Sequence, residues 1–222
     1  MKPLAVAPVL AVLLSAHAAF GAEVPVTYGD AMRWYTSAAE AGSADAQFFL
    51  GRMFETGANR EVDPVAALGW YRKAAEQGHR LAQYQMGLMY QHANGVERDL
   101  AVAREFYAKA AAQHLPEAQF NLGYLYDRGL GTERNAGLAA QWYLKAAERG
   151  LVPAQFNLGV VLAGDAGKGG MAADLVQSWV WLSIAAAGGR ADAAAIRDEV
   201  EARMSEAEIA RARAAFQARR KR

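Results

Sequence analysis

The apolar residues of this chain are spaced as they are on one face of an α-helix, and the spacing repeats. Near the start, Ala31, Trp34, Tyr35, Ala38 and Ala39 lie at positions i, i+3, i+4, i+7 and i+8, which share one helical face. A pair of large apolar residues recurs in later segments, as Trp34-Tyr35, Trp70-Tyr71, Phe106-Tyr107, Trp142-Tyr143 and Trp181-Leu182. The first four pairs are 36 residues apart and the fifth follows after 39. The sequence therefore predicts a tandem repeat of helical units.

A second helix is predicted in each unit, with a glycine inside it. It begins with an Ala-Gln pair, found as Ala46-Gln47, Ala82-Gln83, Ala118-Gln119 and Ala154-Gln155. An apolar residue and then a glycine follow, and the glycines are Gly51, Gly87, Gly123 and Gly159. Glycine in a helix interior costs about 1 kcal/mol relative to alanine. Because this cost is repeated at one position, we expect a neighbouring aromatic ring to approach the backbone closely there.

The predicted helices carry local start and stop signals. Residues that can accept the free N–H groups of a first turn precede the first helix of each unit, namely Thr27, Asp63, Asp99, Asn135 and Asp174. Gly42, Gly78 and Gly150 follow these helices, where glycine readily adopts the left-handed conformation. His114 takes this position in the third unit, which predicts a strained turn. The loop from Gly164 to Gly170 is longer than the earlier ones and is expected to be the most mobile.

The last unit differs from the others in a way that suits the end of an array. Arg197-Asp198 replaces the apolar-glycine pair, and Glu201 replaces the next apolar residue. This helix therefore has a polar outer face, as a terminal repeat needs. Residues 205–208 form a capping box that starts a final helix.

The repeat can be compared with known families through its full pattern. From Ala67 to Tyr90 the unit reads A-x-x-W-Y-x-x-A-A-E-x-G-x-x-x-A-Q-x-x-x-G-x-x-Y. This pattern resembles the Sel-one-like repeat family, a relative of the tetratricopeptide repeats, and residues 118–126 followed by Gly129-x-Gly131 match it closely. A tetratricopeptide array fits less well, because its period is about 34 residues and its Leu-Gly pair lies in the first helix. The resemblance covers Tyr28 to about Gly189. It implies an all-α fold, an α/α superhelical solenoid of tandem helix-turn-helix repeats with a C-terminal capping helix.

Three segments are expected along the chain. Residues 1–22 read as a signal peptide with cleavage near residues 18–22, because Lys2 is followed by an apolar run from Leu4 to Leu14 and by Ala16-His17-Ala18. An uncleaved anchor is the alternative. Residues 23–189 hold about four and a half repeats of 36–39 residues, and residues 190–222 hold capping helices and a basic tail. Export would make the protein periplasmic or secreted, with membrane contact only during export.

The composition offers little for catalysis or metal binding. The chain has 24 Lys and Arg against 23 Asp and Glu, which gives no general attraction to nucleic acid, and it has no cysteine for disulfides or thiolate chemistry. His79, His92 and His114 lack the spacing of a metal site. Lys168 is followed by glycine, where a phosphate loop has serine or threonine, and no G-x-S-x-G motif occurs. We therefore expect no enzyme activity, no metal and no cofactor.

Two sets of residues are singled out by the repeat. The expected structural core contains Trp34, Tyr35, Trp70, Tyr71, Tyr107, Trp142, Tyr143, Gly51, Gly87, Gly123 and Gly159. Opposite the apolar face lie Arg72, Lys73, Lys109 and Lys145, with one lysine in each unit. These cations are candidates for binding an acidic segment of a partner protein or an anionic glycan. Ordinary solubilising lysines are the alternative reading.

The family resemblance implies an adaptor or scaffold, and exported bacterial members are associated with cell-envelope assembly, signalling regulation and host interaction. The hypothesis is therefore a monomeric, non-enzymatic scaffold that mediates protein–protein interaction in the bacterial cell envelope. A cell-wall enzyme or an envelope regulator is the candidate partner. The first alternative is a peptidoglycan-fragment binder that assists a cell-wall enzyme, and the last is a weak β-lactam hydrolase. Both come from a disulfide-rich minority of the family, which this cysteine-free chain matches poorly.

Overall fold

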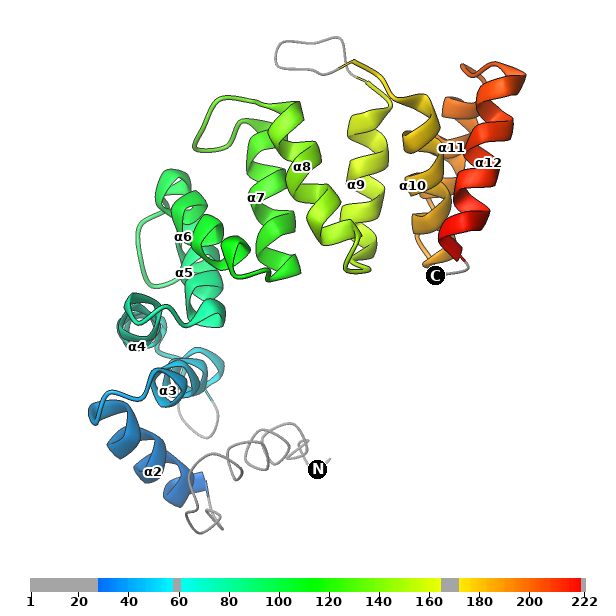
Figure 1. The fold of residues 1–222 in the computed structure, drawn as a ribbon. Coiled ribbons are helices and arrows are strands. Elements are labelled where there is room, and N and C mark those ends of the chain that lie inside the picture. Colours follow the sequence, from blue (N-terminus) through cyan, green and yellow to red (C-terminus); the bar gives the residue numbers. More distant parts are fainter. Residues whose placement is uncertain (1–27, 58–60, 165–171, 221–222) are drawn as a thin grey trace. The chain divides into compact units, whose positions relative to one another are not determined.

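The computed structural model describes residues 28–57, 61–164 and 172–220, and every regular element in these ranges is an α-helix. The chain divides into two compact units, one ending at His79 and the other beginning at Arg80 (Figure 1). The helices of the first unit are α2 (Tyr28–Glu40), α3 (Ala44–Thr56) and α4 (Pro64–Glu76). Those of the second are α5 (Arg80–His92), α6 (Leu100–Ala112), α7 (Pro116–Arg128), α8 (Ala136–Ala147), α9 (Val152–Leu162), α10 (Leu175–Ala187), α11 (Ala193–Glu201) and α12 (Glu206–Arg220). The predicted all-α fold class is confirmed.

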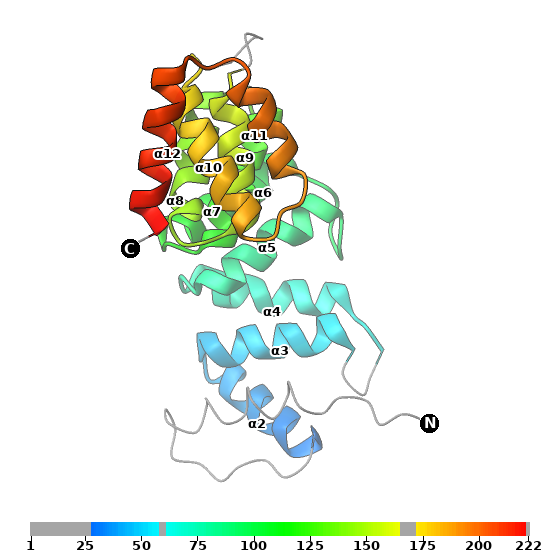
Figure 2. The same cartoon turned by 90° about the vertical axis from the view of Figure 1, so that its right-hand side faces the viewer.

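Within each unit, helices pack against their neighbours in chain order. In the first unit α3 packs against both α2 and α4. In the second unit α5 to α10 follow one another, each in contact with the next, and both α11 and α12 pack against α10 (Figure 2). The buried side chains form successive clusters along this series. Such nearest-neighbour packing is typical of repeat proteins.

The predicted helix starts are present wherever the structure describes them. The side chains of Asp63, Asp99, Asn135 and Asp174 each accept a backbone N–H from the first turn of the helix that follows. Asp99 Oδ1 accepts from two such groups, at 2.9 and 3.0 Å. Thr27 lies outside the described residues. Local residue chemistry therefore determines where these helices begin.

The helix ends also follow the sequence. Gly42, Gly78 and Gly150 have φ angles of 98°, 85° and 86°. His114 adopts the same left-handed region, with φ of 62°, which confirms the predicted strained turn. A non-glycine residue there costs roughly 1–2 kcal/mol. Most of the long loop after Gly164 lies outside the described residues, so its expected mobility stays a prediction.

The glycines inside the second helices lie under large side chains. A Cβ atom on Gly87 would be 2.5 Å from Tyr107 Cε1, and one on Gly123 would be 2.8 Å from Tyr143 Cδ1. Gly159 meets an aliphatic side chain instead, because Leu182 takes the tyrosine position in the last unit. The close approach that the repeated glycine predicts is therefore present.

The capping box that the sequence predicts before the last helix is present, whereas Glu201, expected on a polar outer face, lies among three helices. The Ser205 backbone N–H donates to Glu208 Oε2 at 2.8 Å, and the Glu208 N–H returns to Ser205 Oγ at 3.4 Å, which completes the capping box. Glu201 accepts from Trp179 Nε1 at 2.6 Å and from Arg213 Nη2 at 2.8 Å, and so links α11 to α10 and α12. Among the helices described here, none is long and apolar enough to span a bilayer.

Candidate binding surface

An exposed lysine lies over an aromatic ring in α4, α6 and α8. Lys73 Nζ is 4.0 Å from the centroid of the Trp70 ring, and Lys145 Nζ is 3.8 Å from that of Trp142. The equivalent distance between Lys109 and Phe106 is 5.1 Å. Each lysine follows its ring by three residues, so both side chains lie on one face of the helix. A cation over a ring at an exposed site gains about 0.5–1 kcal/mol, which restricts the lysine while its ammonium stays in water.

The first tryptophans of the repeat pack against the core from its edge, and that of the last pair, Trp181, is buried. Trp34, Trp70 and Trp142 are only partly buried, whereas Tyr71, Tyr107 and Tyr143 are fully buried. Adjacent helical residues point about 100° apart, so in these three pairs only one residue faces the neighbouring helix directly. The tyrosine takes that place and rests on the glycine.

The buried tyrosines are held by hydrogen bonds at their hydroxyls. Tyr71 donates to Glu55 Oε2 at 2.6 Å, and Tyr107 donates to Gln91 Oε1 at 2.8 Å. The Tyr143 hydroxyl accepts from Asn157 Nδ2 at 3.2 Å. Burial raises the pKa of Tyr71, Tyr107 and Tyr143 above the usual value near 10. These hydroxyls are therefore neutral structural groups at physiological pH.

The glutamine of each Ala-Gln pair is also buried and hydrogen-bonded. The side-chain amides of Gln47, Gln119 and Gln155 donate to backbone carbonyl oxygens, in the last case that of Ala147 at 3.2 Å. The Oε1 atom of Gln47 accepts from Gln77 Nε2 at 2.7 Å, and that of Gln83 accepts from Gln113 Nε2 at 2.8 Å. The donor lies thirty residues further along the chain in both cases.

Gln119 and Gln155 both depart from this pattern, because the residues thirty positions further along are Arg149 and Ala185. Gln119 is 1% exposed, and its Oε1 is buried with no hydrogen-bond partner in the described structure. Leaving a buried acceptor unsatisfied costs about 1–3 kcal/mol.

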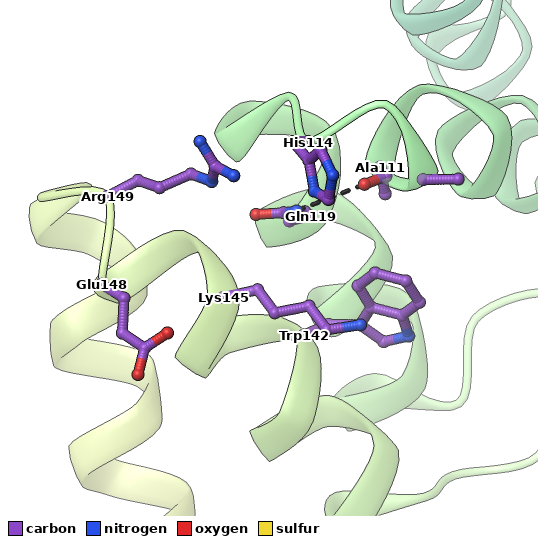
Figure 3. Close-up of a pocket in the computed structure, with 8 residues that line it drawn as sticks. Ala111, His114, Gln119, Trp142, Lys145, Glu148 and Arg149 are labelled. Atoms are coloured by element: carbon purple, nitrogen blue, oxygen red, sulfur yellow. Dashed lines mark hydrogen bonds between the residues drawn. The ribbon is translucent and has the colours of Figure 1, made fainter.

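A pocket of about 370 Å³ opens beside this glutamine. It lies among α6, α7 and α8, and its polar and aromatic lining consists of His114, Gln119, Trp142, Lys145, Glu148 and Arg149 (Figure 3). In Figure 3 the amide nitrogen of Gln119 points to the Ala111 carbonyl, and its oxygen points the other way, to the side of the pocket where Arg149 lies. The pocket thus combines cations, one carboxylate and an unfilled acceptor.

The sequence matches the Sel1 repeat over residues 16–43, 44–79, 80–115, 116–151 and 152–189. The chain belongs to the Sel1 repeat family. Sel1 repeats generally mediate protein–protein interaction. A comparison with curated proteins found no significant match.

Solved structures of Sel1 repeat proteins resemble this one. A protective antigen of uropathogenic Escherichia coli that displays this fold is 39% identical, with a TM-score of 0.72 over 82% of this chain. This chain spans only 38% of that protein. A Sel1 repeat protein from Oxalobacter formigenes is 31% identical, with a TM-score of 0.66, and the match covers 79% of this chain and 70% of that one.

The three histidines within the described ranges of this Sel1 repeat chain have different surroundings. The His79 ring stacks on Phe48 at 4.6 Å, and its Nε2 is 3.2 Å from Asp45 Oδ1. His92 lies at the end of α5, and His114 lines the pocket. No cluster of three metal-ligating side chains occurs within the described residues.

The pocket was missed in the sequence, although two signals for it are present there. One signal is His114 in place of a glycine, and the other is Arg149 at the position that holds Gln77 and Gln113 in the two preceding repeats. Of the predicted cations, Lys145 lines the pocket, and Lys109 lies over its ring on α6. Lys73 and Arg72 are exposed on α4 in the other unit.

Proposed function

We propose that this Sel1 repeat protein is a non-enzymatic adaptor that binds a protein partner in the bacterial cell envelope. The observation that carries the proposal is the repeated lysine over an aromatic ring, present in α4, α6 and α8. An exposed cation that is already restricted loses less conformational freedom on binding than a free lysine does. Each of these cations is suited to bind a carboxylate in an acidic segment of another protein.

The cellular location rests on the N-terminal segment, which lies outside the described residues. Lys2, the apolar run from Leu4 to Leu14 and Ala16-His17-Ala18 have the order of a secretory signal. Cell fractionation with mass spectrometry of the N-terminus tests this part. The proposal expects a periplasmic or secreted protein that begins between residues 19 and 23. A cytoplasmic protein that retains Met1 would contradict it.

Partner binding is tested by photo-cross-linking in the native cell. A photoreactive amino acid is placed at Lys109 or at Lys145 of the full chain, and the adducts are identified by mass spectrometry. The control site is Arg211, which is exposed on α12. The proposal expects the same protein at both lysine positions and not at the control. Adducts only with peptidoglycan fragments, or equal labelling at the control, would contradict it.

A further inference from the structure

Two departures from the repeat meet at the pocket beside Gln119. His114 replaces the glycine that ends the first helix in other units, and it keeps the left-handed φ of 62° at an energetic cost. Arg149 takes the position of Gln77 and Gln113, each of which donates a hydrogen bond to the Ala-Gln glutamine of the preceding repeat. The side chains of both substituted residues line the same pocket. Strain and an unfilled acceptor that occur together are a typical mark of a binding site.

The unfilled acceptor defines one requirement for a ligand. Gln119 Oε1 is fixed in place, because the amide nitrogen of the same side chain donates to the Ala111 carbonyl at 3.2 Å. The ligand must bring an N–H or O–H donor to this oxygen. Because the oxygen is buried, side chains around it must shift before a donor can reach it.

The charges of the lining define a second requirement. Lys145 and Arg149 are exposed cations, and neither takes part in an ion pair within the described residues. Glu148 is the one carboxylate of the lining. The two cations favour a ligand carboxylate, and Glu148 can accept a further N–H from the same ligand.

The surroundings of the Trp142 ring favour a peptide ligand over a sugar ligand. Trp142 packs against the core cluster of α6 and α7, and Lys145 Nζ lies 3.8 Å from the centroid of its ring. A sugar would need this face of the ring for stacking, and the lysine already occupies it. A peptide needs only the acceptors and the cations.

We propose that the pocket binds an acidic, extended peptide segment of the partner protein. A backbone N–H of the segment donates to Gln119 Oε1, and a neighbouring Asp or Glu carboxylate lies between Lys145 and Arg149. This inference rests on the proposed function, since it names the part of the partner that is recognised. The segment thus donates to Gln119 the hydrogen bond that Gln77 donates to Gln47 and Gln113 donates to Gln83.

The test is a titration of the full ¹⁵N-labelled chain, followed through the Gln119 side-chain amide and the Trp142 indole N–H signals. The probes are acetyl-AEAEA-amide, its neutral counterpart acetyl-AQAQA-amide, and an acidic peptide N-methylated at its backbone amides. The acidic peptide is expected to shift both signals, and the other two to bind at least about tenfold more weakly. Equal binding of the acidic and neutral peptides would overturn the proposal. An absence of shifts at peptide concentrations up to roughly 5 mM would also overturn it. So would the finding that a muropeptide, titrated in the same way, shifts the two signals while the acidic peptide does not.

The variant Arg149→Gln tests the mechanism, because a glutamine at this position can donate to Gln119 Oε1 as Gln113 donates to Gln83. It is expected to weaken binding of the acidic peptide at least about tenfold without lowering the melting temperature. Arg98→Gln, an exposed arginine in the loop before α6, is the matched control and should bind like the parent chain. Full binding by Arg149→Gln would overturn the proposal. The titration needs no cellular partner. A failed titration would therefore not affect the cross-linking result, and failed cross-linking would not affect the titration.

Discussion

A Cβ atom on Gly51 would lie 2.7 Å from Cδ1 of Tyr71, so the tyrosine ring rests directly on the backbone of the neighbouring helix. The ring cannot easily move away, because the Tyr71 hydroxyl donates to Glu55 Oε2 at 2.6 Å. The second unit repeats this contact at Gly87 and Tyr107 and at Gly123 and Tyr143. The packing is thus set by a small set of buried residues, and the exposed residues of the helices take no part in it.

Replacing Gly51 with alanine should destabilise the protein. The new methyl group would overlap the Tyr71 ring, and overpacking of this kind costs about 1–3 kcal/mol, partly offset by up to about 1 kcal/mol of improved helix propensity. Urea denaturation followed by circular dichroism measures the change. Gly69→Ala is the matched control, since Gly69 lies in α4 of the same unit with no atom within 4 Å of its would-be Cβ. The control should be stabilised by about 0.5–1 kcal/mol, and equal effects at the two sites would contradict this description of the packing.

Truncation of two adjacent aromatic residues of α8 should lower the free energy of unfolding by clearly different amounts. Tyr143→Ala removes a fully buried ring and should cost about 3–5 kcal/mol. Trp142→Ala removes a partly buried ring and should cost only about 1–2 kcal/mol. Denaturation midpoints of the two variants give the comparison. A larger loss for Trp142→Ala would mean that the tryptophan, and not the tyrosine, holds the helices together.

Much of the fold could be predicted because its signals are local. The caps at Asp63, Asp99, Asn135 and Asp174 depend on residues within one turn of each helix start, and the strained turn at His114 depends on one residue type. The relative burial of tryptophan and tyrosine could not be read from spacing, because adjacent residues of a helix can both belong to a broad apolar face.

The pocket depends on a relationship that no local pattern contains. Gln119 Oε1 is unfilled because residue 149, thirty positions away, is an arginine in place of the glutamine found at 77 and 113. Only the hydrogen bond between Gln113 and Gln83 in the structure indicates that a glutamine at position 149 would donate to Gln119. The lysines are exposed, but they lie over aromatic rings of the repeat and not opposite the face that carries those rings, because the contact depends on side-chain conformation.

Replacing His114 with glycine should stabilise the chain. Glycine adopts the left-handed conformation without the clash that His114 experiences at φ of 62°, so the gain should be about 1 kcal/mol. The reverse change at an equivalent turn, Gly150→His, should cost a similar amount, because Gly150 has φ of 86°. Thermal denaturation of both variants tests the pair. If His114→Gly is destabilised, the imidazole makes a stabilising contact that offsets its strained backbone.

The buried tyrosines should make the protein lose stability in alkali. Burial raises the pKa of Tyr71, Tyr107 and Tyr143 above the value near 10 that they have in the unfolded chain. Their contribution to stability is therefore complete below pH ~10 and falls as the pH rises further, because only the unfolded state then releases the proton. Each tyrosine should lower the free energy of unfolding by about 1.4 kcal/mol per pH unit in this range.

The variant Tyr107→Phe separates this effect from lysine deprotonation in the same pH range. It should cost about 1 kcal/mol at neutral pH through loss of the hydrogen bond to Gln91. Its stability should then fall less steeply above pH ~10 than that of the parent chain. An unchanged slope would show that the Tyr107 hydroxyl ionises as easily in the folded protein as in the unfolded one.

If the lysines held over aromatic rings bind a protein partner, as we propose, replacing them must weaken the affinity for that partner. The dissociation constant of the purified full chain for the cross-linked protein is measured by calorimetry, with Lys73, Lys109 and Lys145 all changed to glutamate in one variant. A control variant carries glutamate in place of Arg80, Arg98 and Arg211, which are exposed cations at other positions. We predict at least about tenfold weaker binding for the lysine variant and little change for the control. Equal affinity of the lysine variant and the parent chain would contradict the claim.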